Sequence, residues 1–391
     1  MRIARIACAL FVLTGGLVRA QTNGAAPAPA VVDTVLHFAA TDGTPLEAKL
    51  SVPAGAKGPV PVMFYLHGAG ARTYDNAIQY RDANGQLHTD KFYDFYSREL
   101  ARRGLGFFRM SKRGCTVEPS GRPVIDRNVF SKATPTVLLA DYEKGLDVLR
   151  QRTEIDPARI VLSGSSEGTR LAPQLALRSP KGVVGIALTS YESDNQRDTV
   201  VWQNTVGPWR NVQKLIPAAV GGKLTRADYD AAVKQDASVA ARLPFAALDT
   251  DADGVVTEAE LARLTRPRLD AILKAVEERN DDFLWQNLAN LSSGYLLDGW
   301  TAEPTSSFLL KLDMPIAIFH GEADGTTRVE GVRETEAAFR AARKTNLAIH
   351  IYPDHDHDLN WTPQGAAAGG PLPYQDAFTF AADVVRSGRP R

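Results

Sequence analysis

A serine held between two glycines is the first feature of the sequence that points to chemistry. Gly164-Ser165-Ser166-Glu167-Gly168 fits the pattern G-x-S-x-G, with Ser166 at its centre. A serine hydroxyl is a weak nucleophile, so it needs an exposed position on a tight turn and a neighbouring base. A strand pattern precedes the motif and a helical pattern over 167–178 follows it, which is the context that such a turn requires. We therefore predict that Ser166 is a nucleophile; a plain glycine-rich turn is the alternative.

A nucleophile of this kind predicts an acid and then a histidine later in the chain, each in a loop that follows a strand. His320-Gly321-Glu322-Ala323-Asp324 follows the strand pattern at 315–319. A carboxylate at this place can orient an imidazole and stabilise its protonated form. We favour Asp324 over Glu322 because Asp324 lies deeper in the loop; a solvated loop acid is the remaining alternative.

Two histidines compete for the role of the base. The strand pattern at 347–352 runs into Pro353-Asp354-His355-Asp356-His357. We favour His357 over His355 because two more residues let the loop turn back over the sheet edge toward Ser166. The alternation of Asp and His is also typical of a surface metal-binding tract. A serine and an aspartate in this chain order would then lack their base, which favours the catalytic interpretation.

Acyl transfer also needs backbone N–H groups that stabilise a developing oxyanion. His67-Gly68-Ala69-Gly70 follows the apolar run at 60–66, where this reaction class places such a donor. We expect one donor from Ala69 or Gly70 and the other from Glu167, the residue after the nucleophile. His67 itself is expected to be a hydrogen-bonded structural residue.

Strand and helix patterns alternate along most of the chain. Expected strands cover 34–39, 46–52, 60–66, 105–110, 160–162, 183–188, 315–319 and 347–352, and expected helices cover 92–103, 136–152, 167–178, 327–344 and 374–386. This alternation predicts an α/β fold, with a mainly parallel sheet flanked by helices on both faces. The long stretch between the strands that end at 188 and begin at 315 contains no clear strand, so we expect a helical insertion there.

Together, these motifs resemble the α/β-hydrolase superfamily, and in particular its bacterial serine esterases. The resemblance covers residues 40–190 and 313–388. It implies the α/β-hydrolase fold, with Ser166 as nucleophile, Asp324 as acid, His357 as base and 67–70 as the oxyanion loop. Met110-Ser111-Lys112-Arg113-Gly114 is similar to the Asp-Lys-Arg-Gly turn of several of these esterases but has Ser111 in place of the aspartate. Arg113 is expected either to bind a substrate carboxylate or to pin a loop.

A second signal lies inside the insertion. Residues 249–260 read Asp-Thr-Asp-Ala-Asp-Gly-Val-Val-Thr-Glu-Ala-Glu, which fits a twelve-residue EF-hand loop. The expected calcium ligands are the side chains of Asp249, Asp251, Asp253, Thr257 and Glu260 and the carbonyl of Val255. Gly254 permits the sharp turn. Without a cation, the crowded carboxylates would repel one another.

The insertion also contains an internal sequence repeat. Residues 222–228 parallel 254–260, but the residues before them lack carboxylates, which predicts a degenerate partner loop that binds no ion. We expect calcium to be structural and the insertion to lie over the carboxyl edge of the sheet as a lid. Six aromatic residues either line the pocket beneath it or form its core, namely Trp202, Trp209, Phe283, Trp285, Tyr295 and Trp300.

The N-terminus is typical of an export signal. Arg2 and Arg5 precede an apolar stretch at 6–18, which is short for a membrane anchor, the alternative interpretation. We expect four segments: a signal peptide at 1–20, a flexible leader at 21–33, a hydrolase core at 34–190 and 313–391, and a helical cap with the calcium loop at 191–312. The mature protein would be periplasmic or secreted, with no membrane span.

Charge and cysteine content indicate which partners and which cross-links the chain is expected to lack. Lys and Arg number 45, as do Asp and Glu, so no net field favours nucleic acid or an anionic membrane. Cys115 is the only cysteine outside the signal, so no internal disulfide is expected in the mature chain. No organic cofactor is implied.

The favoured function is hydrolysis of a small carboxylic ester through an acyl-serine intermediate. A peptidase or amidase, or a calcium-dependent binding protein without turnover, are the alternatives.

Overall fold

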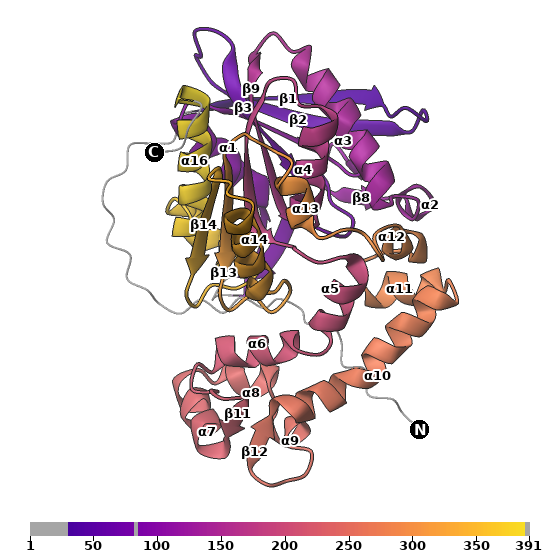
Figure 1. Ribbon diagram of the computed structural model, residues 1–391, viewed down its shortest axis with the longest axis vertical. Helices are drawn as coiled ribbons and strands as arrows, with labels where there is room; N and C mark the ends of the chain where they lie inside the picture. The colour runs from indigo at the N-terminus through magenta and orange to yellow at the C-terminus, as the bar shows by residue number, and fades with distance from the viewer. Residues whose placement is uncertain (1–29, 82–84, 388–391) are drawn as a thin grey trace.

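The computed structural model describes residues 30–81 and 85–387. The predicted signal peptide and the leader up to residue 29 lie outside these ranges. The central element is an eight-stranded sheet with the order β1-β2-β6-β3-β9-β10-β13-β14 (Figure 1). Its strands are β1 (Val31–Ala39), β2 (Pro45–Pro53), β3 (Val60–Leu66), β6 (Gly106–Met110), β9 (Ile155–Ser166), β10 (Val183–Tyr191), β13 (Ile316–Gly321) and β14 (Leu347–Tyr352).

All strands of the sheet run in one direction except β2. Strand β2 pairs antiparallel with both β1 and β6, and every other neighbouring pair is parallel. The carboxyl ends of β3, β9, β13 and β14 therefore meet at one edge. The predicted oxyanion loop, nucleophile, acid and base each follow one of these four strands, so the sheet gathers them at that edge.

Helices cover both faces of the sheet, as predicted from the sequence. They are α1 (Phe92–Arg102), α2 (Arg127–Phe130), α3 (Pro135–Arg150), α4 (Glu167–Arg178), α14 (Val329–Ala341), α15 (Pro363–Ala367) and α16 (Leu372–Ser387). One apolar cluster joins the sheet to α3, α4 and α14, and a second joins its other face to α1 and α16. Alternate residues of β3 divide between the two clusters: Phe64 belongs to the first, and Met63 and Tyr65 belong to the second.

The boundaries of the predicted elements agree closely with the structure for β3, α4 and β14, whose apolar patterns end at polar or glycine-rich loops. Strand β1 begins at Val31, inside the segment predicted as leader, because 31–33 pair with 51–53 of β2. Two small hairpins were not predicted. They are β4 (Ala77–Arg81) with β5 (Leu87–Lys91), and β7 (Cys115–Val117) with β8 (Pro123–Ile125).

The predicted insertion is almost entirely helical. Its helices are α5 (Gln196–Gln203), α6 (Gly207–Leu215), α7 (Arg226–Gln235), α8 (Ser238–Arg242), α9 (Phe245–Leu248), α10 (Glu258–Glu277), α11 (Asp281–Asn287), α12 (Ser293–Asp298) and α13 (Thr305–Leu309). The C-terminal half of α10 and the helices after it share the apolar cluster of α3 and α4. Residues 209–261 form a separate apolar cluster, and we call this part the EF lobe (Figure 1, bottom).

The expectation that the insertion contains no strand was wrong. Strands β11 (Lys223–Thr225) and β12 (Val255–Thr257) pair antiparallel, with Leu224 opposite Val256. Both side chains are fully buried in the core of the EF lobe. The pairing places 223–225 of one repeat beside 255–257 of the other, in antiparallel register. After β11, the chain forms α7 and α8, and the short α9 leads into residues 249–260.

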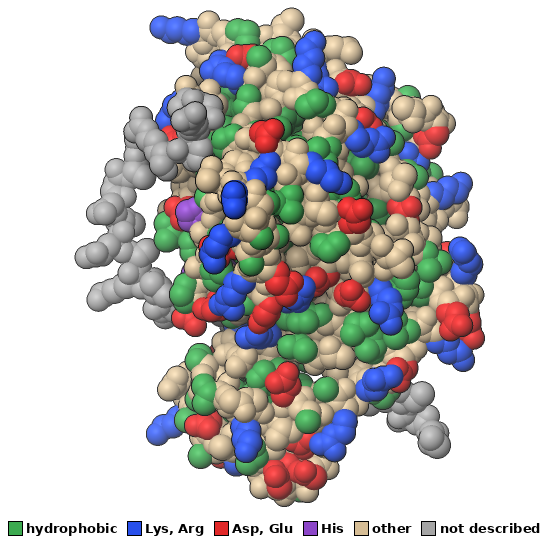
Figure 2. Space-filling view, in the orientation of Figure 1, with side chains coloured by type: hydrophobic (Ala, Val, Ile, Leu, Met, Phe, Trp, Pro, Cys, Tyr) green, Lys and Arg blue, Asp and Glu red, His purple; other side chains and the backbone are tan. Residues whose placement is uncertain are grey.

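Charges of both signs are interspersed over the face shown in Figure 2, and acidic side chains gather at the tip of the EF lobe. Among the described residues, no helix has the length and apolar character needed to cross a bilayer.

The β11–β12 pair allows a test of the EF lobe core. Leu224→Ala should lower the free energy of unfolding by roughly 2–5 kcal/mol, because it leaves a cavity beside Val256. Urea unfolding of the mature protein measures the change. Val220→Ala is the matched control: Val220 lies just before β11 and is 69% exposed, so its truncation should change stability by less than about 0.5 kcal/mol. Equal losses in both variants would contradict the assignment of Leu224 to the core.

Candidate active site

Ser166 stands on a strained turn between β9 and α4. Its backbone has φ 54° and ψ −122°, a conformation that a non-glycine residue adopts only when its surroundings impose it. The flanking glycines explain how the chain tolerates this turn. A Cβ on Gly164 would lie 2.3 Å from the carbonyl oxygen of Gly168, and one on Gly168 would lie 2.1 Å from that of Leu66. Strand β9, helix α4 and strand β3 therefore pass too closely for a side chain at either glycine.

The structure brings Asp324 and His357 together. Nδ1 of His357 lies 2.8 Å from Oδ2 of Asp324. The carboxylate of Asp324 is fully buried and accepts three further hydrogen bonds, from the N–H of Thr326 and from the N–H and hydroxyl of Thr327. These bonds fix the orientation of Asp324, and through it the orientation of the imidazole.

The competing residues lie elsewhere. Glu322 is half exposed and pairs with Arg333 at 2.7 Å on the surface. The Nδ1 atom of His355 lies 2.7 Å from the carbonyl oxygen of Pro353 in its own loop. Neither of these side chains contacts Asp324 or His357. Of the pairs that the sequence offered, the structure therefore joins Asp324 with His357.

The two partners shift each other's pKa. Burial disfavours the imidazolium of His357, but the charge of Asp324 and the hydrogen bond to it outweigh burial and raise the pKa of His357 to about 9. Burial likewise disfavours the Asp324 carboxylate, but the charge of His357 and its hydrogen bond lower the pKa of Asp324 to about 2. Asp324 therefore stays ionised at neutral pH, as the stabiliser of a protonated base should.

Ser166 is the third residue of the predicted triad. No hydrogen bond links its hydroxyl to His357 within residues 30–81 and 85–387, although both follow parallel strands at the same edge. Catalytic hydrogen bonds are often long in unliganded enzymes and shorten when substrate binds.

The oxyanion loop lies directly against the turn of Ser166. A Cβ on Gly68 would be 3.3 Å from the Cβ of Ser166. The backbone N–H groups of Ala69 and Gly70, and that of Glu167 at the start of α4, make no hydrogen bond to another residue in the described chain. The two donors that the sequence predicts, one from Ala69 or Gly70 and one from Glu167, are among these three. Free N–H groups at a helix N-terminus also attract negative charge.

Sequence reasoning missed Lys112. Its ammonium group donates to the carbonyl oxygen of Gly68 at 2.7 Å and to Oε2 of Glu167 at 2.6 Å. Both charged side chains are 1% exposed. The similarity of 110–114 to an esterase turn drew attention to this segment but assigned no role to the lysine.

His67 and Arg113 have structural roles. The ring of His67 contacts the hydroxyl of Tyr93 and the carbonyl oxygen of Met110, and burial lowers its pKa to about 3, so it is neutral. Arg113 binds Asp141 through two hydrogen bonds and also reaches Asp42, so it pins a loop. Neither residue lies free for substrate.

The loop predicted to bind calcium, at 249–260, brings three carboxylates together. Carboxylate oxygens of Asp249, Asp251 and Asp253 lie within 4.8 Å of one another. Gly254 has φ 85° at the turn, and Asp249 accepts a hydrogen bond from its N–H. The carboxylate of Glu260 folds back onto the N–H groups of Thr250 and Thr257, and these bonds lower its pKa to about 2 despite its burial. Of the predicted ligands, Asp249, Asp251 and Asp253 therefore converge and could hold a calcium ion, whereas both carboxylate oxygens of Glu260 are bonded to Thr250 and Thr257.

The insertion rests on the loops that carry Asp324 and His357. Lys214 on α6 forms an ion pair with Asp356, the residue before His357. Arg210 on the same helix pairs with Glu330 at 2.6 Å. Elsewhere in the insertion, the carbonyl oxygen of Ala289 lies close to Gly70 of the oxyanion loop, where a Cβ on Gly70 would approach it to 2.9 Å.

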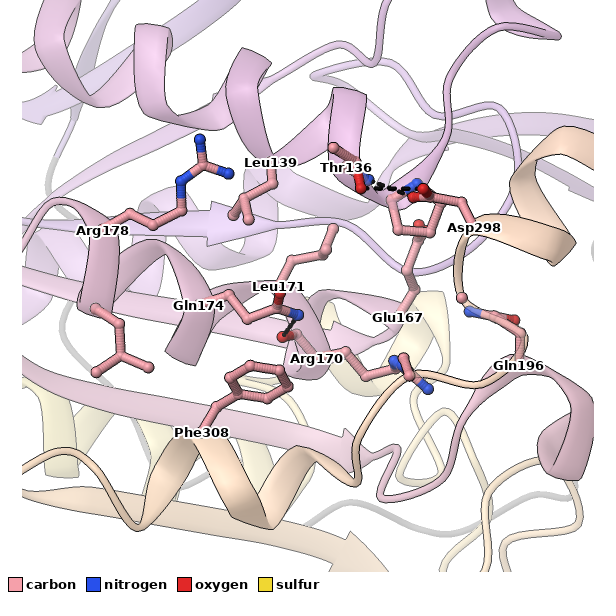
Figure 3. A pocket seen from close by; sticks show the side chains of 14 residues that line it. Thr136, Leu139, Glu167, Arg170, Leu171, Gln174, Arg178, Gln196, Asp298 and Phe308 are labelled. Atoms are coloured by element: carbon pink, nitrogen blue, oxygen red, sulfur yellow. Dashed lines mark hydrogen bonds between the residues drawn. The ribbon is translucent and has the colours of Figure 1, made fainter.

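A cleft of about 320 Å³ opens beside α4 (Figure 3). It lies between α3, α4 and the segments around α5, α12 and α13, with Glu167, Arg170 and Gln196 on its polar side and Leu171 and Phe308 on its apolar side. It begins one residue after Ser166, which is not among its lining residues. The predicted aromatic residues do not line it either; Trp209 and Tyr295 are buried in the cores.

Comparison with known proteins gives only distant similarities. No protein-family model matches the chain, and no curated protein matches it. Among solved structures, it is similar to a Bacteroides ovatus protein described as a candidate dipeptidyl aminopeptidase IV (16% identity, TM-score 0.48), with 92% of this chain and 35% of that protein covered. Est1E from Butyrivibrio proteoclasticus (11%, 0.45) is matched over 83% of this chain and 91% of its own. A bacterial brefeldin A esterase, a homologue of human hormone-sensitive lipase (16%, 0.47), is matched over 95% and 81%.

The strand order of the sheet and the turn at Ser166 identify the fold. The strand order places β6 between β2 and β3, β2 alone is antiparallel, and the serine turn joins β9 to α4 at the carboxyl edge. This chain has the α/β-hydrolase fold. The chain order of Ser166, Asp324 and His357 is also the order of the catalytic residues in that fold. The chain spans about a third of the Bacteroides protein, so the activity of that longer protein gives no assignment here.

The ion pair with Asp324 predicts a pH dependence. The base must be neutral to accept a proton, so the rate should rise with pH through the pKa of His357, near 9. In Asp324→Asn, the largest charge that raises this pKa is gone and burial still lowers it, while Asp358 and Glu192 continue to raise it, so the pKa of His357 should fall well below 9. NMR titration measures the pKa of His357 in the wild type and in the variant, and a pH profile of hydrolysis measures the rate. Glu322→Gln, in the same loop, should leave the titration unchanged, and an unshifted His357 in Asp324→Asn would refute the pairing.

Proposed function

We propose that this protein is a serine hydrolase that cleaves a small carboxylic ester through an acyl-enzyme intermediate. The observation that carries the proposal is the strained turn that presents Ser166 at the same sheet edge as His357 and its buried partner Asp324. In the proposed reaction, His357 takes the proton of the Ser166 hydroxyl as the oxygen attacks the ester carbonyl. The imidazolium then returns that proton to the leaving alcohol, and water repeats the sequence to release the acid.

The surroundings of Ser166 support this chemistry. The tetrahedral intermediate carries a negative oxygen, and the free N–H groups of Ala69 or Gly70 and of Glu167 are the proposed donors to it. Asp324 remains ionised beside the imidazolium that forms. The names of the esterases among the similar structures are compatible with the proposal but do not decide it.

The nucleophile can be tested directly. The mature protein in calcium-containing buffer should hydrolyse p-nitrophenyl butyrate and react with a fluorophosphonate probe, and Ser166→Ala should lose both, with the rate falling by roughly 10⁴–10⁶-fold. Ser165→Ala is the matched control, because Ser165 lies in the same motif but has ordinary strand geometry; it should still react with the probe. Equal turnover by wild type and Ser166→Ala would refute the assignment.

The same experiments separate the alternatives. A peptidase or amidase uses the same serine, so it would react with the probe but prefer anilide or peptide substrates over esters. A calcium-dependent binding protein would bind calcium and leave Ser166 unlabelled. The intact geometry of the Asp324–His357 pair favours an enzyme over a pure binder.

We also propose that calcium binds the loop at 249–260 and stabilises the insertion. The support is the convergence of three carboxylates and the pairing of β11 with β12, which joins the loop to its degenerate partner. Because Asn211 on α6 lies against Gly325 in the Asp324 loop and Lys214 pairs with Asp356 in the His357 loop, a folded lobe would also help hold those loops in place. This role suits an exported protein, since extracellular calcium is abundant.

Calcium binding can be measured by isothermal titration calorimetry. We expect a Kd on the order of 10⁻⁴–10⁻³ M, as in other extracellular modules, and a higher melting temperature with calcium present. Asp251→Asn and Glu260→Gln should weaken binding by at least tenfold and lose the thermal shift. Asp228→Asn is the control: Asp228 holds the twelfth position of the partner loop, so calcium affinity should not change. A melting temperature that is insensitive to calcium in the wild type would contradict the proposal.

A further inference from the structure

Lys112 lies between the two segments that carry the proposed oxyanion donors. It follows β6, and its ammonium group touches the oxyanion loop at Gly68 and the start of α4 at Glu167, with distances of 2.7 and 2.6 Å. Its backbone N–H also donates to the carbonyl oxygen of Arg72, two residues after the oxyanion loop, at 2.9 Å. One residue therefore connects three points around Ser166.

The bond to Gly68 acts on the neighbouring N–H. The carbonyl of Gly68 and the N–H of Ala69 belong to one planar peptide unit and point in opposite directions. A donor that holds the Gly68 oxygen therefore fixes the direction in which the Ala69 N–H points. A positive charge on that oxygen also polarises the amide and makes its N–H a stronger donor.

The bond to Glu167 acts on the second donor. Glu167 is the first residue of α4, and its own N–H is the donor on that side. The Oε2 atom of Glu167 binds the same ammonium group that holds Gly68. The two N–H groups thus belong to residues whose relative position depends on one buried nitrogen.

We propose that Lys112 is the positioning residue of the oxyanion hole: by holding Gly68 and Glu167 together, it sets the spacing and direction of the N–H groups of Ala69 and Glu167. The inference rests on the proposed serine hydrolase function. Lys112 touches no reacting atom and acts only through these two residues.

Stability alone is a poor explanation for such a buried pair. Both side chains are 1% exposed, and removing two charges from water costs about as much as their attraction returns. Burial lowers the pKa of Lys112, and the charge of Glu167 opposes that shift. An apolar pair of the same size would fill the space at similar stability, whereas only a hydrogen-bond donor can hold the Gly68 oxygen.

The test removes the ammonium without leaving a lone buried charge. In the double variant Lys112→Met with Glu167→Gln, both partners are neutral, so folding should be retained. We expect kcat for p-nitrophenyl butyrate to fall by roughly 10²–10³-fold, the loss typical of one oxyanion donor, with KM nearly unchanged. If this variant does not fold, Lys112→Gln with Glu167→Gln keeps the polarity but is too short to reach Gly68.

A pair of inhibitors separates positioning from general damage. A trifluoromethyl ketone adds to the nucleophilic serine and forms an oxyanion, whereas the corresponding methyl ketone binds without this addition. The double variant should lose affinity for the trifluoromethyl ketone by the same factor as kcat and keep its affinity for the methyl ketone. Equal kcat and equal trifluoromethyl ketone affinity in variant and wild type would overturn the inference, as would equal losses for both ketones.

A matched control lies on the same turn. Arg113 and Asp141 also form a buried ion pair, at 2.6 Å, but neither contacts the oxyanion loop. Arg113→Gln with Asp141→Asn should lower the melting temperature and leave kcat per active site unchanged. Failure of the proposed function would be visible in the wild type, as absent turnover and an unlabelled Ser166. Failure of this inference would instead leave wild type, control and Lys112 variant equally active.

Discussion

The close approach of three backbone segments at Ser166 is the constraint on which the candidate active site depends. Strand β9 enters the turn, α4 leaves it, and the end of β3 lies against both, with spacing that leaves no room for a Cβ at Gly164 or Gly168. This contact holds Ser166 at positive φ and places the oxyanion loop beside it. The strain of the turn is offset by the two apolar clusters that hold the sheet between its helices.

Two pairs of charged side chains lie beside this contact. Asp324 is balanced by His357, and Lys112 is balanced by Glu167. Each pair joins segments that are distant in the sequence, and each places its charge where the proposed reaction develops the opposite one. In this way the interior orients the proton acceptor on one side of Ser166 and the N–H donors on the other.

The insertion adds a second level of organisation. Its EF lobe has its own apolar core, and α10 runs from that lobe to the helices packed on α3 (Figure 1). Contacts from α6 reach the loops of Asp324 and His357, and Ala289 lies over the oxyanion loop. The insertion therefore contacts several of the loops that form the candidate active site. In the proposed role, calcium would change the stability of the insertion.

The sequence by itself determined the sheet, the order of its loops and the calcium motif, because these depend on local patterns: apolar runs, glycines beside Ser166, and carboxylates at alternate positions from Asp249. It could rank His357 above His355 and Asp324 above Glu322 only by loop length, and tertiary structure decided which of these side chains meet. Strands β11 and β12 were missed because three-residue strands have no readable period and form by pairing across the repeat. Lys112 was missed for a related reason: its partners, Gly68 and Glu167, are 44 and 55 residues away, and only folding brings them to one nitrogen.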